Sequence, residues 1–382
     1  MPVMKTRRWT PVFASITALA TALPSIGAAA ADASASGFGS FGVTYQIREL
    51  GSLPGDIESI ARSINDIGAA AGSSIAPPPS PPTRTGPTVI PRPVIFEREG
   101  GVAEIGGGVT GEAFAINNRG QAVGYTVPGT SLQAVHQAAL FDRESGEAIT
   151  LPVLPGGSAS EAFGINDRKQ AVGFSSSSEG PRATLWQDGT VVNLGLLPGD
   201  DSSGAWAINN RGHAAGSSSV FVSTNGLGTV LSHAVLFANG TVTRLPDRPG
   251  AIAGNTNSEA FGINDFDQVV GDAEGNVLDV HETHAVLWEH GSVVDLGTLP
   301  GGDFSSAAAI NNLGLIAGRG TDASGQVRAV LWLYGTIINL GTLPGHIHSE
   351  AYGINDWGVV VGESEGEDGL PHAVIWEPGR RR

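Results

Sequence analysis

The chain has 382 residues, of which 55 are glycine, 23 are proline and only 15% are charged. Its formal net charge is −16, and an excess of acid argues against nucleic-acid binding through a phosphate-neutralising surface. The absence of cysteine excludes disulfides, thiolate zinc sites and cysteine nucleophiles. The 41% apolar content permits a folded core, and the low share of charge excludes a coiled coil.

The first 31 residues have the pattern of a bacterial secretory signal peptide. Three basic residues precede a mildly apolar stretch over residues 12–26, and a run of alanines follows. A transmembrane anchor is the alternative, but two prolines and many small polar residues make the stretch too short and too polar to span a bilayer. We therefore expect cleavage after residue 31, a flexible start over residues 32–42, and export to the periplasm or beyond. Residues 6–9 loosely resemble a twin-arginine signal, so the export route stays open.

The strongest pattern is a phrase that occurs seven times over residues 43–377. Most copies read Ser-x-Ala-x-x-Ile-Asn-Asx, then Val-Val-Gly, then Ala-Val-Leu-Trp, then Leu-Gly-x-Leu-Pro-Gly, or a close variant of each part. The Ile-Asn-Asx triplet recurs every 43 to 55 residues. The triplets begin at Ile64, Ile116, Ile165, Ile208, Ile263, Ile310 and Ile354.

Each copy contains four short β-favouring runs separated by Asn-Asx, Gly or Pro-Gly turns, and none has a helical period. Four antiparallel strands in a unit of this length are typical of a propeller blade. The sequence therefore predicts an all-β, seven-bladed β-propeller of four-stranded antiparallel blades. A β-helix is the alternative, although its rungs are usually shorter. The aromatic residue of the third run should fill the core between blades; its members are Phe96, Phe141, Trp186, Phe237, Trp288, Trp332 and Trp376.

The two ends of the repeat predict how the ring closes. The seventh copy stops after Trp376 without a fourth strand, and residues 45–55 form an extra fourth strand with its Leu-Pro-Gly turn. Pairing the two ends in one blade removes an exposed sheet edge. The extra strand is then outermost, so the Glu-Ala-Phe-Gly-Ile-Asn run lines the axis and Ala-Val-Leu-Trp lies third from it. Residues 378–382 remain as a short basic tail.

The repeated phrase resembles the bacterial extracellular HAF repeat family over residues 45–376. Three copies, which begin at His233, His284 and His372, read His-Ala-Val where the family name expects His-Ala-Phe. This is a mild apolar change at a strand position. The resemblance implies an exported prokaryotic protein and brings no settled activity.

Two positions of the repeat place ionisable side chains in register around the ring, on the face that carries the variable loops. The longest of these loops is the proline-rich stretch over residues 77–93. Propellers usually bind ligands where variable loops surround the axis. Four residues before each isoleucine lie Ile60, Glu112, Glu161, Gly204, Glu259, Ser306 and Glu350. Before each third strand lie Arg92, Gln137, Arg182, His233, His284, Arg328 and His372.

These residues support two interpretations. Carboxylates near the axis, with imidazoles and guanidiniums outside them, could bind a cation or a sugar or cleave a glycosidic bond. Alternatively, residues repeated in most blades pair with each other and with loop backbone to hold repeated structure. The second interpretation is favoured because a catalytic residue is needed only once. For an enzyme, the catalytic candidates are Glu161, Glu350, Glu259, Glu112, His372 and His284.

Residues that depart from the repeat are better candidates for a ligand site. Trp206 and Tyr352 replace the phenylalanine of the inner strand, and Arg62 occupies the same place in the first copy. The ligand-binding candidates also include the third-strand residues His233, His284, His372, Arg182 and Arg328. Candidates for a divalent metal follow the Leu-Pro-Gly turns; they are Asp200, Asp201, Asp303, His346 and His348.

The sequence contains no Gly-x-Ser-x-Gly elbow, phosphate loop or His-Glu-x-x-His helix. We therefore predict an exported, monomeric binding module without a cofactor or a membrane span, although a structural calcium ion is compatible with the turn aspartates. Its variable-loop face would bind a surface glycan or a protein partner. The alternative is a glycoside hydrolase or polysaccharide lyase that uses the axial glutamates, and a scaffold without a small ligand is the third hypothesis.

Overall fold

The computed structural model describes residues 44–77, 90–128, 135–143, 145–224, 227–251, 256–275 and 283–379. The chain divides into two units, Met1–Ser36 and Gly37–Arg382, and all described residues belong to the second. The expected signal peptide and flexible start, most of the proline-rich loop, and the last three residues of the basic tail lie outside the described residues. In the ranges given above, no helix is long and apolar enough to cross a membrane.

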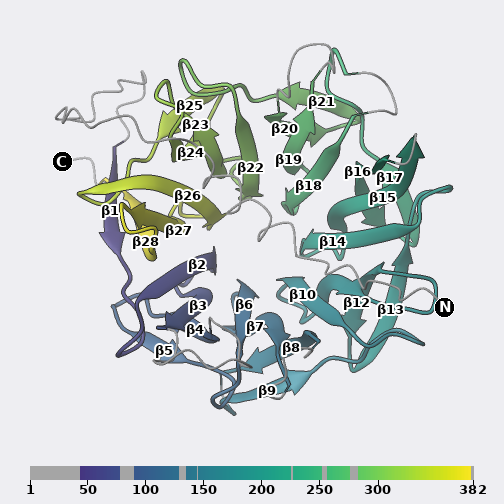
Figure 1. Cartoon of the computed structure of the whole chain (residues 1–382), viewed down its shortest axis with the longest axis horizontal. Helices are drawn as coiled ribbons and strands as arrows, with labels where there is room; N and C mark the ends of the chain where they lie inside the picture. The colour runs from purple at the N-terminus through teal and green to yellow at the C-terminus, as the bar shows by residue number, and fades with distance from the viewer. Residues whose placement is uncertain are drawn as a thin grey trace. The chain divides into compact units, whose positions relative to one another are not determined.

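The second unit is an all-β, seven-bladed propeller, as the repeat predicts. Seven four-stranded antiparallel sheets surround one axis (Figure 1). In six blades the strands follow chain order outward from the axis, and in the seventh the order from the outside inward is β1-β28-β27-β26. The run with Ile-Asn is therefore the inner strand and the aromatic run is the third, as predicted.

The strands of each blade are short and separated by tight turns. Blade one has β2 (Glu58–Ile64), β3 (Ala70–Ala76), β4 (Ile90–Phe96) and β5 (Val102–Glu104). Blade two has β6 (Gly111–Ile116), β7 (Ala122–Thr126), β8 (Gln137–Asp142) and β9 (Glu147–Thr150). Blade three has β10 (Ser160–Ile165), β11 (Ala171–Ser175), β12 (Arg182–Gln187) and β13 (Thr190–Gly195). Blade four has β14 (Ser202–Ile208), β15 (Ala214–Thr224), β16 (Leu227–Ala238) and β17 (Thr241–Arg244).

The remaining three blades follow the same plan. Blade five has β18 (Ser258–Ile263), β19 (Val269–Glu274), β20 (Thr283–Glu289) and β21 (Ser292–Asp295). Blade six has β22 (Ser305–Ile310), β23 (Ile316–Thr321), β24 (Val327–Leu333) and β25 (Thr336–Asn339). Blade seven has β26 (His346–Ile354), β27 (Val360–Gly366), β28 (Pro371–Pro378) and β1 (Tyr45–Glu49).

The N-terminal strand closes the ring, which confirms the prediction from the chain ends. β1 pairs antiparallel with β28, from Tyr45 opposite Pro378 to Glu49 opposite Val374. The Tyr45 hydroxyl also donates a hydrogen bond of 2.9 Å to the carbonyl of Gly358. Blade seven therefore has the same four strands as the others, although its outer strand is more than 300 residues away in sequence from the strand beside it.

Two closed circles of hydrogen bonds join the seven turns between the first and second strands. In the first circle, each turn asparagine donates through Nδ2 to the carbonyl of the corresponding asparagine in the next blade, at 2.9–3.0 Å. These residues are almost fully buried, and their Oδ1 atoms accept backbone N–H groups of their own turns, as in Asx turns. The circle consists of Asn65, Asn117, Asn166, Asn209, Asn264, Asn311 and Asn355.

The second circle uses the residue that follows each of these asparagines. Its backbone N–H donates to the side-chain Oδ1 of its counterpart in the next blade, at 2.7–2.9 Å. We call the end of the propeller that carries both circles the turn face, and the opposite end the loop face. The members of the second circle are Asp66, Asn118, Asp167, Asn210, Asp265, Asn312 and Asp356.

A third contact between blades explains a paired exception in the sequence. In six blades, the alanine N–H at the start of the third strand donates to a serine Oγ of the next inner strand, at 2.9–3.0 Å. In blade one that alanine is replaced by Pro93, which has no N–H. Its neighbour in blade two is Gly111, which has no hydroxyl. Donor and acceptor are therefore missing together, and neither leaves an unpaired group.

The aromatic residues of the third strands fill the spaces between blades, as predicted. All seven are at most 3% exposed, and each lies in one of the apolar clusters between neighbouring blades. The indole N–H groups of Trp186, Trp288 and Trp332 donate to backbone carbonyls. These side chains are therefore structural and leave the axis for other residues.

Removal of the closing strand tests the ring. Deleting residues 45–51 should lower the free energy of unfolding by about 4 kcal/mol or more, because it removes a run of backbone hydrogen bonds and exposes the edge of β28. Trimming residues 32–41, which precede the paired strand, should leave it unchanged. Urea denaturation of both truncated proteins measures the difference, and equal losses would contradict closure by β1.

The first circle of asparagines, which is buried, should stabilise the protein more than the second circle. Asn311→Ala removes a donor to Asn355 and an acceptor for two backbone N–H groups at a site that is 4% exposed, so we expect a loss of about 2–3 kcal/mol. Asn312→Ala, at the next position, should cost about 1 kcal/mol because water replaces its partners. Chemical denaturation of both variants checks the order of the two effects.

Candidate functional site

Each inner strand contains a β-bulge, and the bulged residues form a belt around the axis. In every blade, the pairing of the first two strands skips the residue two positions before the repeated isoleucine. A bulge leaves its residue outside the ladder and redirects its side chain. The belt residues are Arg62, Phe114, Phe163, Trp206, Phe261, Ala308 and Tyr352.

The repeated glycine of the second strand is required by this bulge. A Cβ at Gly173 would lie 1.9 Å from the carbonyl oxygen of Glu161, and the other blades have equivalent distances of 1.8–2.1 Å. Only glycine permits so close an approach of two backbones. The repeated glycine therefore fixes where the bulge lies, and with it where the belt residue emerges.

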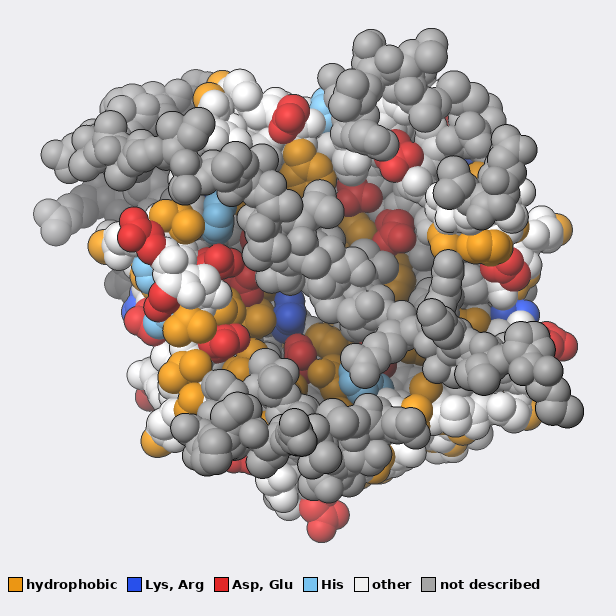
Figure 2. Space-filling model, in the orientation of Figure 1, with side chains coloured by type: hydrophobic (Ala, Val, Ile, Leu, Met, Phe, Trp, Pro, Cys, Tyr) orange, Lys and Arg blue, Asp and Glu red, His pale blue; other side chains and the backbone are white. Residues whose placement is uncertain are grey.

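The belt residues touch one another across blade boundaries. The ring of Phe163 is 5.2 Å from that of Phe114 and 4.8 Å from that of Trp206. On another side of the axis, the Arg62 guanidinium lies 4.9 Å from the centre of the Tyr352 ring. Around the middle of the ring of blades, Figure 2 shows apolar side chains next to acidic and basic ones. The belt therefore has an aromatic part, in blades two to four, and a charged part, in blades seven and one.

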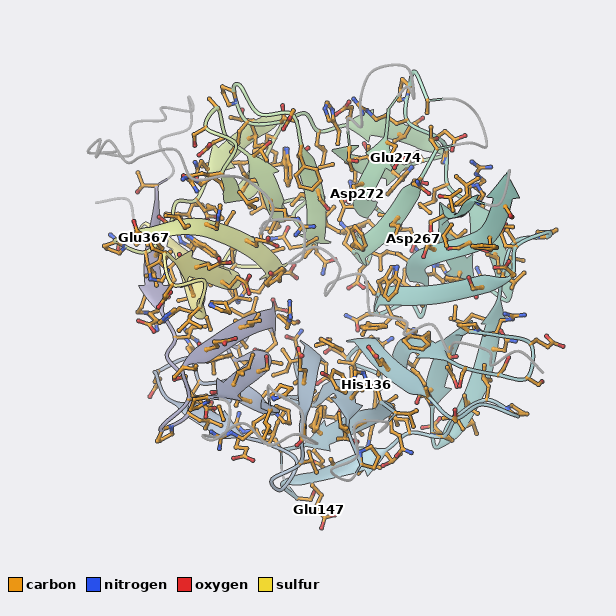
Figure 3. All side chains as sticks on the ribbon, viewed as in Figure 1. His136, Glu147, Asp267, Asp272, Glu274 and Glu367 are labelled. Carbon is orange, nitrogen blue, oxygen red and sulfur yellow. The ribbon has the colours of Figure 1, made fainter. Side chains whose placement is uncertain are left out.

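Second-strand side chains extend the aromatic part. Tyr125 and Phe174 lie 5.6 Å from Phe114 and 6.1 Å from Phe163, respectively. The imidazole of His136, which lies just before β8 (Figure 3), stacks on the ring of Tyr125 with 3.9 Å between the ring centres. Tyr125 and Phe174 lie opposite Glu112 and Glu161, the second residues of β6 and β10, so these apolar surfaces extend from the belt towards the loop face.

Two glutamates face this aromatic surface. Glu161 is 3% exposed; its Oε1 lies 2.7 Å from His136 Nδ1, and its Oε2 has no hydrogen-bond partner. Burial raises the pKa of Glu161, and the hydrogen bond with His136 opposes that rise. Glu112 accepts a hydrogen bond from the Tyr125 hydroxyl, and its Oε2 lies 3.6 Å from Arg62. The indole Nε1 of Trp206 is buried and unpartnered among the residues that the structure describes.

Hydrogen-bonded groups of blades six and seven surround the charged part of the belt. Arg319 Nη1 lies 2.7 Å from Glu350 Oε2, and the Tyr352 hydroxyl donates to the same oxygen at 3.1 Å. Glu363 lies opposite Glu350 in the sheet register. Burial, together with the charge of Glu350, raises the pKa of Glu363 to about 7.

Blade five contributes a pair of buried carboxyl groups. Glu259 and Asp272 lie opposite each other on the first and second strands. Burial and the neighbouring Asp272 raise the pKa of Glu259 to about 8. Burial also raises the pKa of Asp272 to about 6, although it accepts a hydrogen bond of 2.8 Å from Ser306. Near neutral pH this pair therefore holds a proton.

The third-strand candidates bond elsewhere than to the axial glutamates. Arg182 donates to the carbonyl of Asp201, in the connection to blade four, and Arg328 donates to the carbonyl of Ile347, at the start of β26. The histidines lie beside acidic groups of the outer strand or of the connection that follows it: His233 by Asp200 at 3.7 Å, His284 by Asp295 at 3.0 Å and His372 by Glu49 at 2.9 Å. The pairs expected between these residues and the axial glutamates are absent among the described residues.

The metal candidates are dispersed. Within the described ranges, no group of three or more His, Asp or Glu side chains is arranged to hold a metal ion. Asp201 accepts a backbone N–H of Phe221, and Asp303 accepts the hydroxyl of Thr321. His346 and His348 lie in β26, and the ring of His346 is 5.2 Å from that of His372.

Sequence reasoning missed the second-strand side chains that follow the repeated glycine. The register places each of them opposite an axial residue, and they vary from blade to blade within an otherwise regular phrase. That variation directly after the repeated glycine was the available signal. The residues are Tyr125, Phe174, Asp272, Arg319 and Glu363.

No protein-family model matches the chain, and no curated protein matches it. Among solved structures, the chain resembles an acylaminoacyl peptidase of Pyrococcus horikoshii at 13% identity and a TM-score of 0.49, over 85% of this chain and 52% of the peptidase, so it spans about half the peptidase's length. It also resembles TolB from Acinetobacter baumannii at 14% identity and a TM-score of 0.39, over 82% of this chain and 80% of TolB. A third similar structure is AofleA from Arthrobotrys oligospora, at 11% identity and a TM-score of 0.39, over 78% of this chain and 89% of AofleA. These likenesses concern the fold alone. The chain is a β-propeller with a belt of bulged side chains at its axis.

The buried carboxyl groups predict a dependence of stability on pH. The pKa of Glu259 is about 8 in the folded protein and near 4.5 when unfolded, so unfolding releases a proton between these values. The stabilisation is complete below pH 4.5 and is lost as the pH rises towards 8, at about 1.4 kcal/mol per pH unit. Glu259→Gln should flatten this slope, whereas Glu147→Gln, at an exposed position, should not. Unfolding measured from pH 5 to pH 8 compares the three proteins.

Proposed function

We propose that the protein is an exported binding module that holds a glycan at the axial belt, on its loop face. The observation that carries the proposal is the aromatic surface formed by Phe114, Phe163 and Trp206 beside unpartnered polar atoms. Sugar rings present apolar C–H faces that lie on aromatic rings, and their hydroxyls need acceptors and donors. The free oxygen of Glu161 and the indole N–H of Trp206 supply one of each.

The unpartnered atoms favour a ligand over a purely structural belt. Buried polar groups in proteins are normally hydrogen-bonded, and leaving one unpaired costs free energy. Beside the charged part of the belt, Arg319 and Tyr352 both donate to Glu350. In the aromatic part, Glu161 and Trp206 keep one free atom each. A hydroxyl-rich ligand would pair both.

Export and the family resemblance are part of the same proposal. The expected signal peptide and the similarity of the repeat to the extracellular HAF family support a location outside the cytoplasm. The absence of cysteine is compatible with that location. A glycan of the cell surface or the surroundings is the ligand class that such a protein would meet.

A carbohydrate-active hydrolase or lyase is the second candidate, and the state of Glu161 favours it. A buried carboxyl group with a raised pKa can remain protonated and donate that proton to a leaving oxygen, as a general acid does. Glu112 lies near enough for its charge to contribute to that rise. Release of reducing ends from a polysaccharide, lost in Glu161→Gln, would identify this activity.

Binding to a panel of acidic and neutral polysaccharides tests the main proposal. By isothermal titration with the mature protein, Trp206→Ala should weaken binding about tenfold or more, because it removes both a stacking surface and a donor. Glu161→Gln should weaken it less, since the amide still accepts a hydrogen bond.

Trp357→Ala is the matched control, because it removes an exposed indole from the turn face. Equal effects of the two tryptophan variants, or no binding across the panel, would overturn the proposal.

A further inference from the structure

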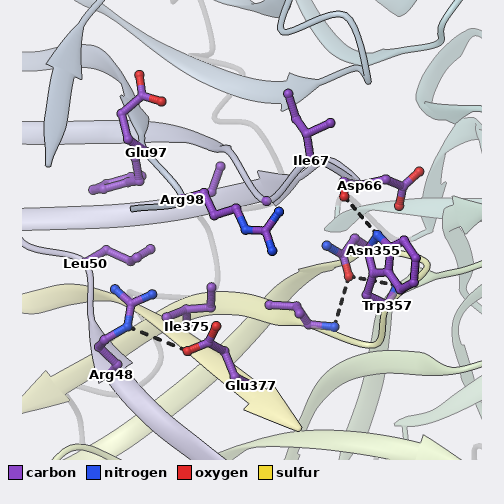
Figure 4. A pocket seen from close by; sticks show the side chains of 14 residues that line it. Arg48, Leu50, Asp66, Ile67, Glu97, Arg98, Asn355, Trp357, Ile375 and Glu377 are labelled. Carbon is purple, nitrogen blue, oxygen red and sulfur yellow. Dashed lines mark hydrogen bonds and ion pairs between the residues drawn. The ribbon is translucent and has the colours of Figure 1, made fainter. Parts of the chain in front are cut away.

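A hollow lies on the turn face, at the junction of blade seven with blade one, and none of the belt residues lines it. Its volume is about 360 Å³ (Figure 4). Both ends of the folded chain line it: β1 contributes Arg48, its neighbour Leu50 follows, and β28 contributes Ile375. Blade one contributes the opposite wall, from Ile67 to Phe96. We call this hollow the junction groove.

The floor of the junction groove is apolar and part of its rim is an exposed indole. Phe96, Ala70 and Ile375 are at most 6% exposed and belong to the core between the two blades. Trp357 and Ile67 at the rim are 72% and 53% exposed. The indole N–H of Trp357 donates a hydrogen bond of 2.9 Å to the carbonyl of Asp66, which fixes the ring as a wall of the groove (Figure 4).

The charges that line the groove are paired, with one exception. Arg48 lies 3.7 Å from Glu377, and Glu97 lies 2.8 Å from Arg143. Asp66 accepts hydrogen bonds on both carboxylate oxygens. Among the lining residues, which all lie in the described part of the chain, Arg98 is the one cation without an ion pair.

Local departures from the repeat aim Arg98 at the groove. Its turn, between the third and fourth strands, is longer than the turns of blades three to six, such as Asp188-Gly189. The Arg98 side chain crosses Gly68, where a Cβ would meet its Cδ at 3.0 Å. Figure 4 shows the guanidinium extending over the groove towards Trp357. The position of Trp357 varies among the blades: blades two to four carry arginine there, and blades one, five and six carry Ile67, Phe266 and Leu313.

We propose that the junction groove binds a small amphiphilic carboxylate. Its apolar tail would lie on Phe96 and Ile375 against the Trp357 indole, and its carboxylate would pair with Arg98. A guanidinium matches a carboxylate through two parallel hydrogen bonds. The carboxylates of Asp66 and Glu377 at the same rim would repel a doubly charged phosphate more strongly than a singly charged group. The volume suits a small ligand with few polar contacts.

Three probes of equal chain length test the proposal on the mature protein. By isothermal titration, n-octanoate should bind with one-to-one stoichiometry, whereas n-octylammonium and n-octanol should bind at least tenfold more weakly. Arg98→Gln should weaken octanoate binding about tenfold or more. Arg168→Gln, which removes an exposed arginine from the turn face of blade three, should leave it unchanged.

A second variant and a second readout keep the test decisive. Ile67→Glu places a carboxylate at the exposed rim and should weaken octanoate binding through repulsion without disturbing the core. Because both chain ends line the groove, saturating octanoate should also raise the melting temperature of the wild-type protein and leave that of Arg98→Gln unchanged. Absence of saturable octanoate binding, equal affinity of Arg98→Gln, or equal affinity for n-octylammonium would each overturn the proposal.

Discussion

The circle of seven asparagine side chains at the turn face is the constraint on which the rest of the propeller depends. Each Nδ2 atom bonds to the backbone of the next blade, and each Oδ1 atom holds its own turn. One side chain therefore fixes both the local turn and the position of its neighbour. A blade cannot shift along the axis without breaking two buried hydrogen bonds, and an unpaired buried amide is costly. Hydrogen bonds near the axis therefore hold the blades together, while the aromatic residues of the third strands fill the spaces between blades further from the axis.

Because the asparagine circle fixes the turn at the end of each inner strand, the side chains a few residues before that turn can differ between blades. Each inner strand is bulged, and its second strand carries a glycine with almost no space for a Cβ. The backbone at the bulge is the same in all blades, so the belt side chain and its second-strand neighbour are free to differ. Blades two to four use this freedom for Phe114, Phe163 and Trp206, and blades seven and one use it for Tyr352 and Arg62. The site is asymmetric although the scaffold that presents it is nearly symmetric.

This difference between a repeated backbone and variable side chains explains how much of the structure could be predicted from the sequence. Blade number, strand order and closure by β1 follow from repeated residues, because repetition reports backbone structure. Trp206, Tyr352 and Arg62 stood out because they interrupt a regular phrase. The partners of the axial glutamates did not, since they depend on strand register: Glu161 reaches His136 of the preceding blade and not an arginine of its own. Register and the burial that shifts a pKa arise only when strands are paired in space.

The odd number of blades makes the junction of blade seven with blade one unlike the other six. In the second circle of hydrogen bonds at the turn face, aspartate and asparagine alternate. The side-chain amides of Asn118, Asn210 and Asn312 each donate to the aspartates on both sides. Seven positions cannot alternate completely, so Asp356 and Asp66 are neighbours without an amide between them. The indole N–H of Trp357 bonds to the Asp66 backbone at this place. The two chain ends, the mismatch in the circle and the junction groove therefore coincide, and a ligand in that groove would act on the least symmetric boundary of the ring.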